Sequence, residues 1–119
     1  MAGEVKWEKN YDDGLAQAKK DKKFVLVDIY TDWCGWCKKL DKDVYSQKEV
    51  GERLAKDFVA IKLNPEKSAK NKKIVQTFEV SGFPTILFLN SDGKQVGKIG
   101  GYVPADEFIR QLDAVVKKK

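Results

Sequence analysis

Two stretches of this chain are apolar on both alternating faces, which is the pattern of a strand buried on both sides. They cover residues 24–30, FVLVDIY, and residues 58–64, FVAIKLN, and each contains one charged residue, Asp28 or Lys62. Strands buried on both faces are typical of a parallel sheet with helices packed on each side. We therefore expect these two strands to lie in the interior of such a sheet.

Two further apolar stretches, residues 84–90 and 94–100, are predicted to form a hairpin. The pair Asp92-Gly93 lies between them, and an Asp-Gly pair in this position is a strong signal for a tight turn. A hairpin pairs its strands in opposite directions, so one strand becomes antiparallel and the sheet is mixed. A short edge strand is expected at residues 5–7.

Between the strands, apolar residues recur at intervals of three and four, which predicts helices. The cysteine-containing segment is one of them, because apolar positions continue at that spacing from Cys34 to Val44. Ser46 and Glu49 have the spacing of a capping box at the start of the next helix. The remaining helices are expected at residues 11–20, from Pro65 to about residue 79, and from Pro104 onward.

This order of elements predicts an α/β fold with a mixed central β-sheet flanked by helices on both faces. Strands that alternate with helices imply right-handed crossovers and helix layers on each side of the sheet. No linker, repeat or low-complexity segment divides the 119 residues, a length that one domain commonly has. Residues 1–119 are therefore expected to form a single domain.

The chain has a formal net charge of +5, from 23 Lys and Arg against 18 Asp and Glu. One interpretation is a solubilising surface of lysines, and the other is attraction to nucleic acid or an acidic partner. Arg occurs only at positions 53 and 110, without interleaved aromatic residues, so nucleic-acid binding is not expected. No apolar run approaches the roughly 18 residues of a membrane span, and no membrane insertion is expected.

The chain contains no histidine. This excludes a Ser-His-Asp triad, a Cys-His nucleophile pair and every metal site that needs a histidine ligand. Any chemistry must therefore come from Cys, Asp, Glu, Lys or Tyr.

Cys34 and Cys37 are the only cysteines, and three interpretations of the pair compete. A structural disulfide would close a very short loop and restrain the unfolded chain little. A zinc site would have two of its four ligands and no histidine, so only a metal or iron-sulfur cluster shared between two chains would remain. A reversible dithiol, placed where a buried strand turns into a helix, is the interpretation that we favour, with no metal and no cofactor.

The start of a helix favours a thiolate at Cys34. Unpaired N–H groups and the helix dipole stabilise an anion there, and Lys38 and Lys39 add a small, screened positive charge. A lower thiol pKa raises the fraction of thiolate, which is the attacking species. Cys37 lies one turn further on, on the stripe that faces the core, and is expected to be more buried and to resolve the mixed disulfide. Gly35 is expected to allow a tight turn and to leave room for a partner chain.

Three blocks, VDIYTDWCGWCKKL, IKLN and GFPTILF, resemble the corresponding blocks of the thioredoxin family, and the order of elements is similar along almost the whole chain. The resemblance implies a thioredoxin fold and thiol-disulfide exchange as the activity. The charged segment before the first buried strand, the Trp7 region and the TDWC sequence look closer to bacterial thioredoxin-like domains of the disulfide-interchange type. The C-terminal domain of the transmembrane electron carrier that feeds the periplasm is one such domain.

The resemblance also implies roles for two charged residues. Asp28 matches a buried carboxylate of the family and is expected to act as the general base for the proton of Cys37. An acid inside an apolar strand should in any case have a raised pKa. Lys62 matches a lysine near that carboxylate. The alternatives are that Asp28 merely pairs with Lys62, and that Lys62 extends from the strand end into solvent.

Besides Gly35, four residues are expected to contact the substrate. Phe83-Pro84 matches the loop in which the family carries a cis proline beside the disulfide, and the backbone of Phe83 is expected to pair with an extended substrate segment. Trp33 and Trp36 flank Cys34. We expect Trp36 to be exposed and to enlarge an apolar contact patch, whereas core packing is the alternative for Trp33.

The Gly35-Trp36 dipeptide differs from the Gly-Pro of the family's common reductants and from the His-containing dipeptides of its oxidants and isomerases. Without that histidine the reduced state is less stabilised, so a reductase or electron-relay role is expected. The resemblance thus implies a monomer that reduces or exchanges disulfides in proteins and receives electrons from an upstream dithiol partner. The alternative is a non-catalytic binding or chaperone module on the same scaffold.

The first ten residues, MAGEVKWEKN, lack the apolar stretch of a signal peptide. This observation alone does not assign a compartment. The resemblance favours an extracytoplasmic, for example periplasmic, location after removal of a signal over a cytoplasmic one.

Overall fold

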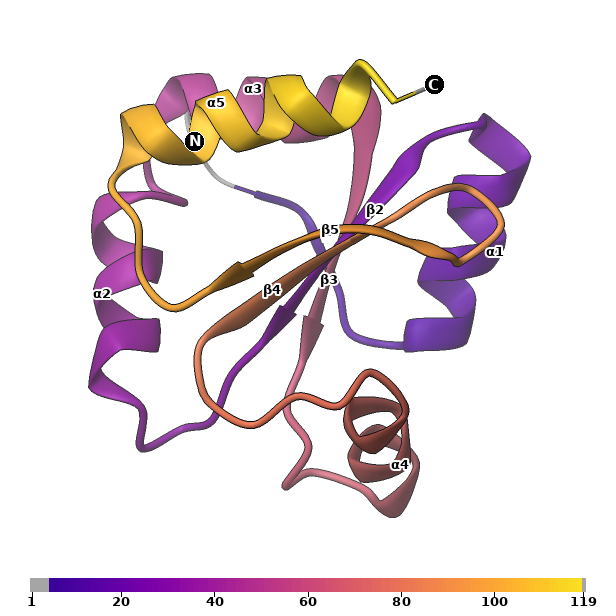
Figure 1. Ribbon diagram of the computed structural model, residues 1–119, viewed down its shortest axis with the longest axis vertical. Coiled ribbons are helices and arrows are strands. Elements are labelled where there is room, and N and C mark those ends of the chain that lie inside the picture. Colours follow the sequence, from indigo (N-terminus) through magenta and orange to yellow (C-terminus); the bar gives the residue numbers. More distant parts are fainter. Residues whose placement is uncertain (1–4, 119) are drawn as a thin grey trace.

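The computed structural model describes residues 5–118, and within them it has five strands and five helices (Figure 1). In chain order the elements are β1 (Trp7–Glu8), α1 (Tyr11–Asp21), β2 (Phe24–Ile29), α2 (Gly35–Asp43), α3 (Lys48–Asp57), β3 (Phe58–Leu63), α4 (Ala69–Thr77), β4 (Thr85–Leu89), β5 (Gln95–Gly100) and α5 (Ala105–Val116).

The sheet is mixed, as predicted, with the strand order β1-β3-β2-β4-β5. Strands β1 and β2 run parallel to β3, whereas β4 runs antiparallel to both β2 and β5. The predicted hairpin joins β4 to β5, and Gly93 in its turn has a φ of +85°, a conformation that glycine adopts without steric cost. The register of β2 on β3 places Asp28 opposite Lys62, so the two charged residues of the inner strands meet.

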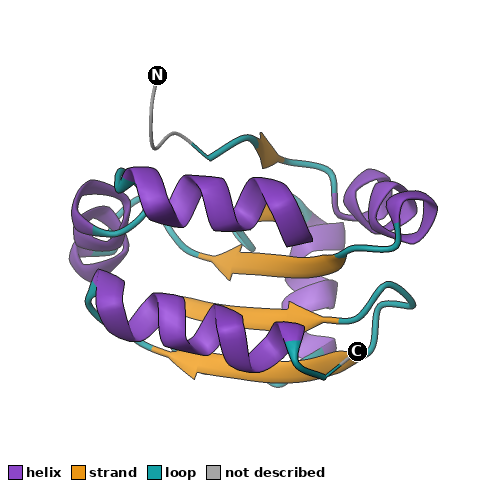
Figure 2. Ribbon diagram, turned by 90° about the horizontal axis from the view of Figure 1, so that it is seen from above, coloured by secondary structure: helices purple, strands orange, loops and turns teal. Residues whose placement is uncertain are grey.

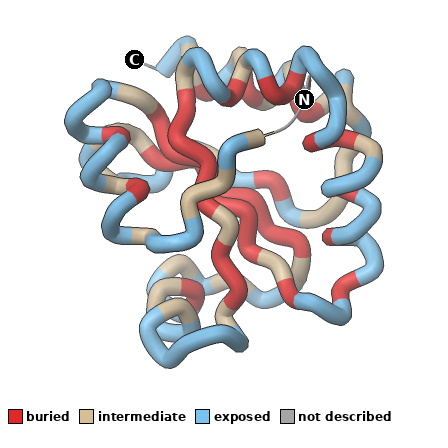
Figure 3. The backbone as a smooth tube through the Cα atoms, turned by 180° about the vertical axis from the view of Figure 1, so that it is seen from behind, coloured by how far each residue is buried: buried red, intermediate tan, exposed pale blue. Residues whose placement is uncertain are grey.

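Helices cover both faces of the sheet. Side chains of α2, α3 and α5 form one core with the sheet, and those of α1 and α4 form a second core on the other face. Figure 1 shows the two groups on opposite sides of the diagonal strands, and Figure 2 looks onto α3 and α5 with α4 behind the sheet. All residues of β2 and β4 are buried, which Figure 3 shows as red stretches through the middle of the molecule. The apolar runs of β2, β3 and β4 therefore mark strands that are covered on both sides, whereas β5 at the edge of the sheet is mostly exposed or half-buried.

Two local predictions were wrong. The capping box of Ser46 and Glu49 does not form, because α3 begins after Gln47 without a side-chain cap and the Ser46 hydroxyl donates instead to the carbonyl of Lys42 in α2. The edge strand comprises Trp7–Glu8 rather than residues 5–7, because only this pair lies in register with β3. Neither difference changes the topology.

Candidate active site

Cys34 and Cys37 are joined by a disulfide, with 5.3 Å between their Cα atoms. They lie at the point where the chain leaves buried strand β2 and enters α2. Cys34 is the N-cap residue of α2, with extended backbone, and its Sγ accepts the backbone N–H of Cys37 at 3.1 Å. The sulfur thus occupies the position at which a helix offers its unpaired N–H groups, which is a site that favours negative charge.

The two lysines that follow add little positive charge at Cys34, as expected from the sequence. Lys39 forms an ion pair with Asp43 at 3.0 Å and lies over the ring of Tyr102, and Lys38 is exposed. Solvent screens such charges strongly. The backbone at the start of α2 is therefore the main feature that would stabilise a thiolate at Cys34.

Exposure alone does not distinguish the two sulfurs. In the disulfide form Cys34 is 5% exposed and Cys37 is 2% exposed, a difference in the expected direction but a small one. The distinction between the two residues rests on their positions in the helix. Cys34 is the cap residue, whereas Cys37 is inside the first turn and faces the core.

Gly35 is the first residue of α2 and its φ is not positive, so the predicted tight turn does not account for this glycine. A Cβ built at Gly35 would meet no atom within 4 Å. The open space beside it agrees with the second part of the prediction, namely room for a partner chain.

Asp28 on β2 and Lys62 on β3 form an ion pair. Lys62 Nζ donates to Asp28 Oδ2 at 2.9 Å and also to Asp41 Oδ1 at 2.6 Å. The Asp28 side chain is buried and the Lys62 side chain is only 11% exposed, so Lys62 points inward and does not extend into solvent. The predicted pairing of Asp28 with Lys62 is therefore confirmed.

Burial raises the pKa of the Asp28 carboxyl, and the charge of Lys62 offsets this only in part. Burial lowers the pKa of Lys62, but Asp28 and Asp41 outweigh it, so that the pKa of the ammonium is raised overall. The Asp28 pKa thus lies closer to neutrality than that of an ordinary carboxyl, which suits a group that accepts and returns a proton.

Two tryptophans extend from the surface beside the disulfide. Trp33 is 66% and Trp36 is 58% exposed, so core packing does not explain Trp33. The Trp33 ring packs edge-on against Phe83, with 5.9 Å between centroids, and its Nε1 donates to Glu66 at 3.0 Å. Two exposed aromatic side chains thus come from residues close to Cys34 in the chain, one before it and one after it.

The peptide bond between Phe83 and Pro84 is cis, as the resemblance implied. It precedes β4, and the carbonyl of Pro84 accepts the N–H of Gly101 at 2.9 Å. This bond ties the proline loop to the segment after β5.

Sequence reasoning missed several residues that the structure brings to this region. Tyr102 packs on Trp36, with 5.6 Å between ring centroids, and Asp41 shares the Lys62 ammonium. Both come from segments without a distinguishing pattern. The carboxylate of Asp41 lies four residues after Cys37 in α2, and this spacing, which places both on one helix face, was the only available signal.

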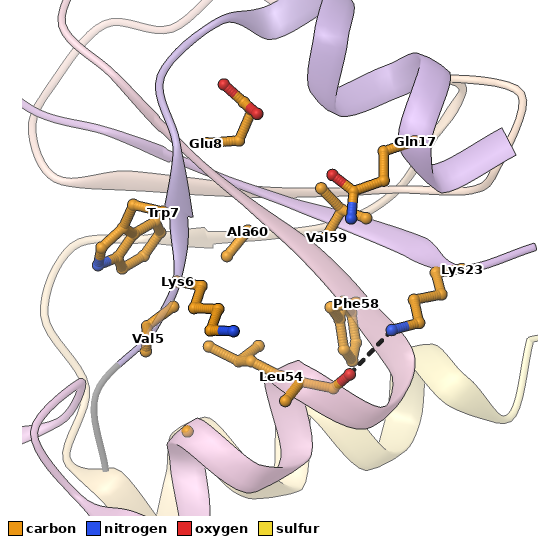
Figure 4. A pocket seen from close by; sticks show the side chains of 12 residues that line it. Val5, Lys6, Trp7, Glu8, Gln17, Lys23, Leu54, Phe58, Val59 and Ala60 are labelled. Carbon is orange, nitrogen blue, oxygen red and sulfur yellow. Dashed lines mark hydrogen bonds between the residues drawn. The ribbon is translucent and has the colours of Figure 1, made fainter. Parts of the chain in front are cut away.

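The pocket and the acidic side chains elsewhere in the described residues do not form a second candidate site. A pocket of about 460 Å³ lies along the edge formed by β1 and β3, and Figure 4 shows its lining from β1, α1, α3 and β3. It contains neither cysteine. Within residues 5–118, no group of three or more Cys, Asp or Glu side chains has the arrangement of a metal site. No helix in the described part of the chain has the length and apolar character needed to cross a membrane.

Comparisons with known proteins agree with this geometry. A family model described as a thioredoxin-like domain matches residues 11–116. The thiol:disulfide interchange protein DsbD of Actinobacillus pleuropneumoniae serotype 5b is 34% identical over 100 residues, which cover 82% of this chain and 16% of the relative. The chain thus spans about a sixth of the length of this curated relative.

Solved structures show the same fold. DsbH oxidoreductase superposes with a TM-score of 0.86 at 22% identity, covering 99% of this chain and 88% of that one. The C-terminal domain of DsbD from Neisseria meningitidis, in its reduced form, has a TM-score of 0.76 at 24% identity and covers 87% of this chain and 91% of that one. The family match over residues 11–116 shows that the chain belongs to the thioredoxin-like domain family, and the solved structures show that it has the same fold.

Proposed function

We propose that this chain reduces or exchanges disulfides in proteins, with Cys34 as the nucleophile and Cys37 as the resolving thiol. The observation that carries the proposal is the disulfide in which the Cys34 sulfur caps α2. A structural disulfide of this size would stabilise the fold little. A sulfur at a helix start, by contrast, is placed to be a good attacking group and a good leaving group.

The reaction runs in two exchanges. The Cys34 thiolate attacks one sulfur of the substrate disulfide, and the other substrate sulfur leaves as a thiolate and takes up a proton. Cys37 then loses its proton and attacks Cys34 Sγ, so that the Cys34–Cys37 disulfide forms and the remaining substrate sulfur leaves. Two electrons pass to the substrate, and an upstream dithiol returns the protein to its reduced form by the reverse sequence.

Asp28 acts as the base for Cys37 in this proposal. Its raised pKa supports proton transfer near neutral pH, and it lies on β2 directly before the segment that carries the cysteines. Lys62 balances the negative charge that Asp28 acquires when it releases the proton again.

The substrate binds over the exposed surface around the disulfide. Trp33, Trp36 and Phe83 supply apolar contact, and the open space at Gly35 admits the substrate chain. Next to Pro84, which has no N–H, the backbone of Phe83 pairs with an extended segment of the substrate. Tyr102 joins this surface through its contact with Trp36.

A reducing or relay direction agrees best with the Gly35-Trp36 dipeptide, which has no histidine to stabilise the reduced form. The name of the curated relatives, thiol:disulfide interchange protein, supports exchange between protein dithiols. We further propose that residues 1–119 act as one monomeric domain without a cofactor, in an extracytoplasmic compartment.

The test is dithiothreitol-dependent reduction of insulin. Cys34→Ser should abolish turnover, because no nucleophile remains. Cys37→Ser should accumulate mixed disulfides, because the adduct on Cys34 is no longer displaced. Turnover retained by the Cys34→Ser protein would refute the proposal. Equilibration of the Cys34–Cys37 couple with glutathione should give a potential in the reducing range, whereas an oxidising value would reverse the proposed direction.

A further inference from the structure

The ammonium of Lys62 is enclosed by three aromatic rings that come from three separate segments. Its Nζ lies 5.0 Å from the ring centroid of Trp7, 4.6 Å from that of Tyr30 and 5.4 Å from that of Tyr45. All three distances are within the range of cation–π attraction, which strengthens when water is excluded. We call Trp7, Tyr30 and Tyr45 the Lys62 cage.

The cage is held in place by the fold. Trp7 is opposite Ala60 in the β1–β3 pairing, and Ala60 and Lys62 are two residues apart on β3 and therefore share a face. Figure 4 shows Trp7 on β1 at this edge of the sheet. Its ring meets Tyr45 edge-on, with 4.7 Å between centroids, and Tyr45 contacts Phe108 of α5. The edge strand thus carries one wall of the cage.

Two carboxylates compete for the single ammonium. Asp28 is buried, whereas the side chain of Asp41 is 48% exposed. Solvation favours an ammonium that turns outward, toward Asp41 and water. The three rings lie within 5.4 Å of the ammonium and the Lys62 side chain is only 11% exposed, so the cage opposes such an outward turn.

We propose that Trp7 is a positioning residue for thiol exchange, since its ring holds the Lys62 ammonium against Asp28 and so makes β1 part of the proton-transfer apparatus. The role in exchange rests on the function proposed above, but the placement of the ammonium does not. The groups that face the pair are Asp28 on β2, Asp41 on α2, and the phenols of Tyr30 and Tyr45.

The neighbouring groups indicate what loss of the ring would do. Burial raises the pKa of Asp28, and Lys62 is the main group that lowers it. The Tyr45 hydroxyl also lowers it, although it does not reach Asp28 with normal hydrogen-bond geometry, and Asp28 Oδ1 has no partner among the described residues. Asp28 therefore depends on Lys62, and an ammonium that turned outward would leave the pKa of Asp28 higher still.

The test is a carbon-13 NMR titration of the Asp28 carboxyl. Trp7→Leu should move its midpoint upward by about half a pH unit to one pH unit, whereas Trp7→Phe, which keeps a ring, should stay near the wild type. Lys62→Met should also raise the midpoint, and adding Trp7→Leu to it should change nothing more. Phe58→Leu, an aromatic replacement in the same core, is the control and should leave the midpoint unchanged.

An unchanged Asp28 midpoint in Trp7→Leu would overturn the proposal. So would a Trp7→Leu substitution that shifts the midpoint equally in the wild-type background and in the Lys62→Met background. A measurement on the unaltered protein covers the case in which Trp7→Leu does not fold. The ε-methylene protons of Lys62 should resonate upfield because of the ring currents, and ordinary chemical shifts would contradict the cage.

The role in exchange has its own readout. The pH profile of mixed-disulfide resolution should move with the Asp28 midpoint in Trp7→Leu, and a profile that stayed in place would show that Trp7 does not act on the reaction. If the Cys34→Ser protein retains turnover while the Asp28 midpoint shifts as expected in Trp7→Leu, the proposed activity is wrong but the placement of Lys62 by Trp7 is supported.

Discussion

Trp36 is the residue that most distinguishes the surface around the disulfide. It lies between the two cysteines, and more than half of its surface is exposed although it is a large apolar side chain. Its indole packs against the ring of Tyr102, and the ammonium of Lys39 lies over that same Tyr102 ring. A rigid exposed aromatic next to a reactive sulfur is suited to binding a protein surface, because little side-chain entropy is lost on binding.

Trp36→Ala should therefore weaken binding of a protein substrate more than it slows the chemistry. We expect KM for insulin to rise about tenfold with a small change in kcat, and little effect on reduction of a small aromatic disulfide. Lys38→Ala, a neighbouring exposed change, serves as the control. Equal losses for the large and the small disulfide would show that Trp36 affects the cysteines and not the docking.

Part of the site could be predicted at this scale, and part could not. Cys34, Cys37, Asp28 and Lys62 were identifiable because each departs from its surroundings, the acid and the lysine as the single charges in apolar strands. The cage residues, Tyr102 and Asp41 belong to ordinary stretches of sequence. Their importance comes from tertiary contacts between segments far apart in the chain, which no local pattern encodes.

At the scale of elements, three helices begin with the same kind of cap. Asn10 caps α1 and Ser68 caps α4, each through a side-chain oxygen that accepts the backbone N–H of the third residue of the helix. Cys34 does the same for α2 with sulfur. Sulfur is a weaker hydrogen-bond acceptor than oxygen. The use of a cysteine as the cap of α2 is therefore better explained by the reactivity of its sulfur than by helix stability. The failure of the Ser46–Glu49 box shows the limit of spacing as a signal, since the end of α2 competes for the same hydroxyl.

The end of α1 gives a test of helix termination that is separate from the chemistry. Lys22 closes this helix in the left-handed conformation, with a φ of 57°, which costs energy for any residue with a Cβ. Lys22→Gly should raise the free energy of unfolding by up to about 1 kcal/mol. Lys20→Gly, two residues earlier and inside the helix, should lower it by about 1 kcal/mol. Chemical denaturation measures the free energy of unfolding of both variants. If the two substitutions changed it in the same direction, Lys22 would not be the residue that ends α1 in the left-handed conformation.

For the whole molecule, the buried Asp28 ties stability to pH. The folded protein binds the Asp28 proton more tightly than the unfolded chain does, because burial raises the pKa of this carboxyl. Stability therefore falls as the pH rises from the ordinary pKa of Asp to the raised one, and the cost is complete above that range. The fold thus carries an ionisable group in its interior at the expense of some stability at neutral pH.

Asp28→Asn should remove this cost. The free energy of unfolding at neutral pH should increase by about 1–3 kcal/mol, since Lys62 keeps Asp41 as a partner. The gain should shrink as the pH falls below the raised pKa and vanish near the pKa of an unfolded Asp, about 3.9. Denaturation of the oxidised protein across this range measures the effect, with the half-exposed Asp41→Asn as control. If the increase in the free energy of unfolding did not depend on pH, it would not come from the ionisation of Asp28.

Both sulfurs lie just after the end of the central strand β2, at the start of α2, and this shared position has a consequence for how partners bind. In the proposed function, the electron donor and the electron acceptor must each approach the same few side chains, so the two cannot be bound at the same time. Such a protein must release one partner before it binds the next. Its turnover rate therefore depends on how quickly each partner dissociates after exchange.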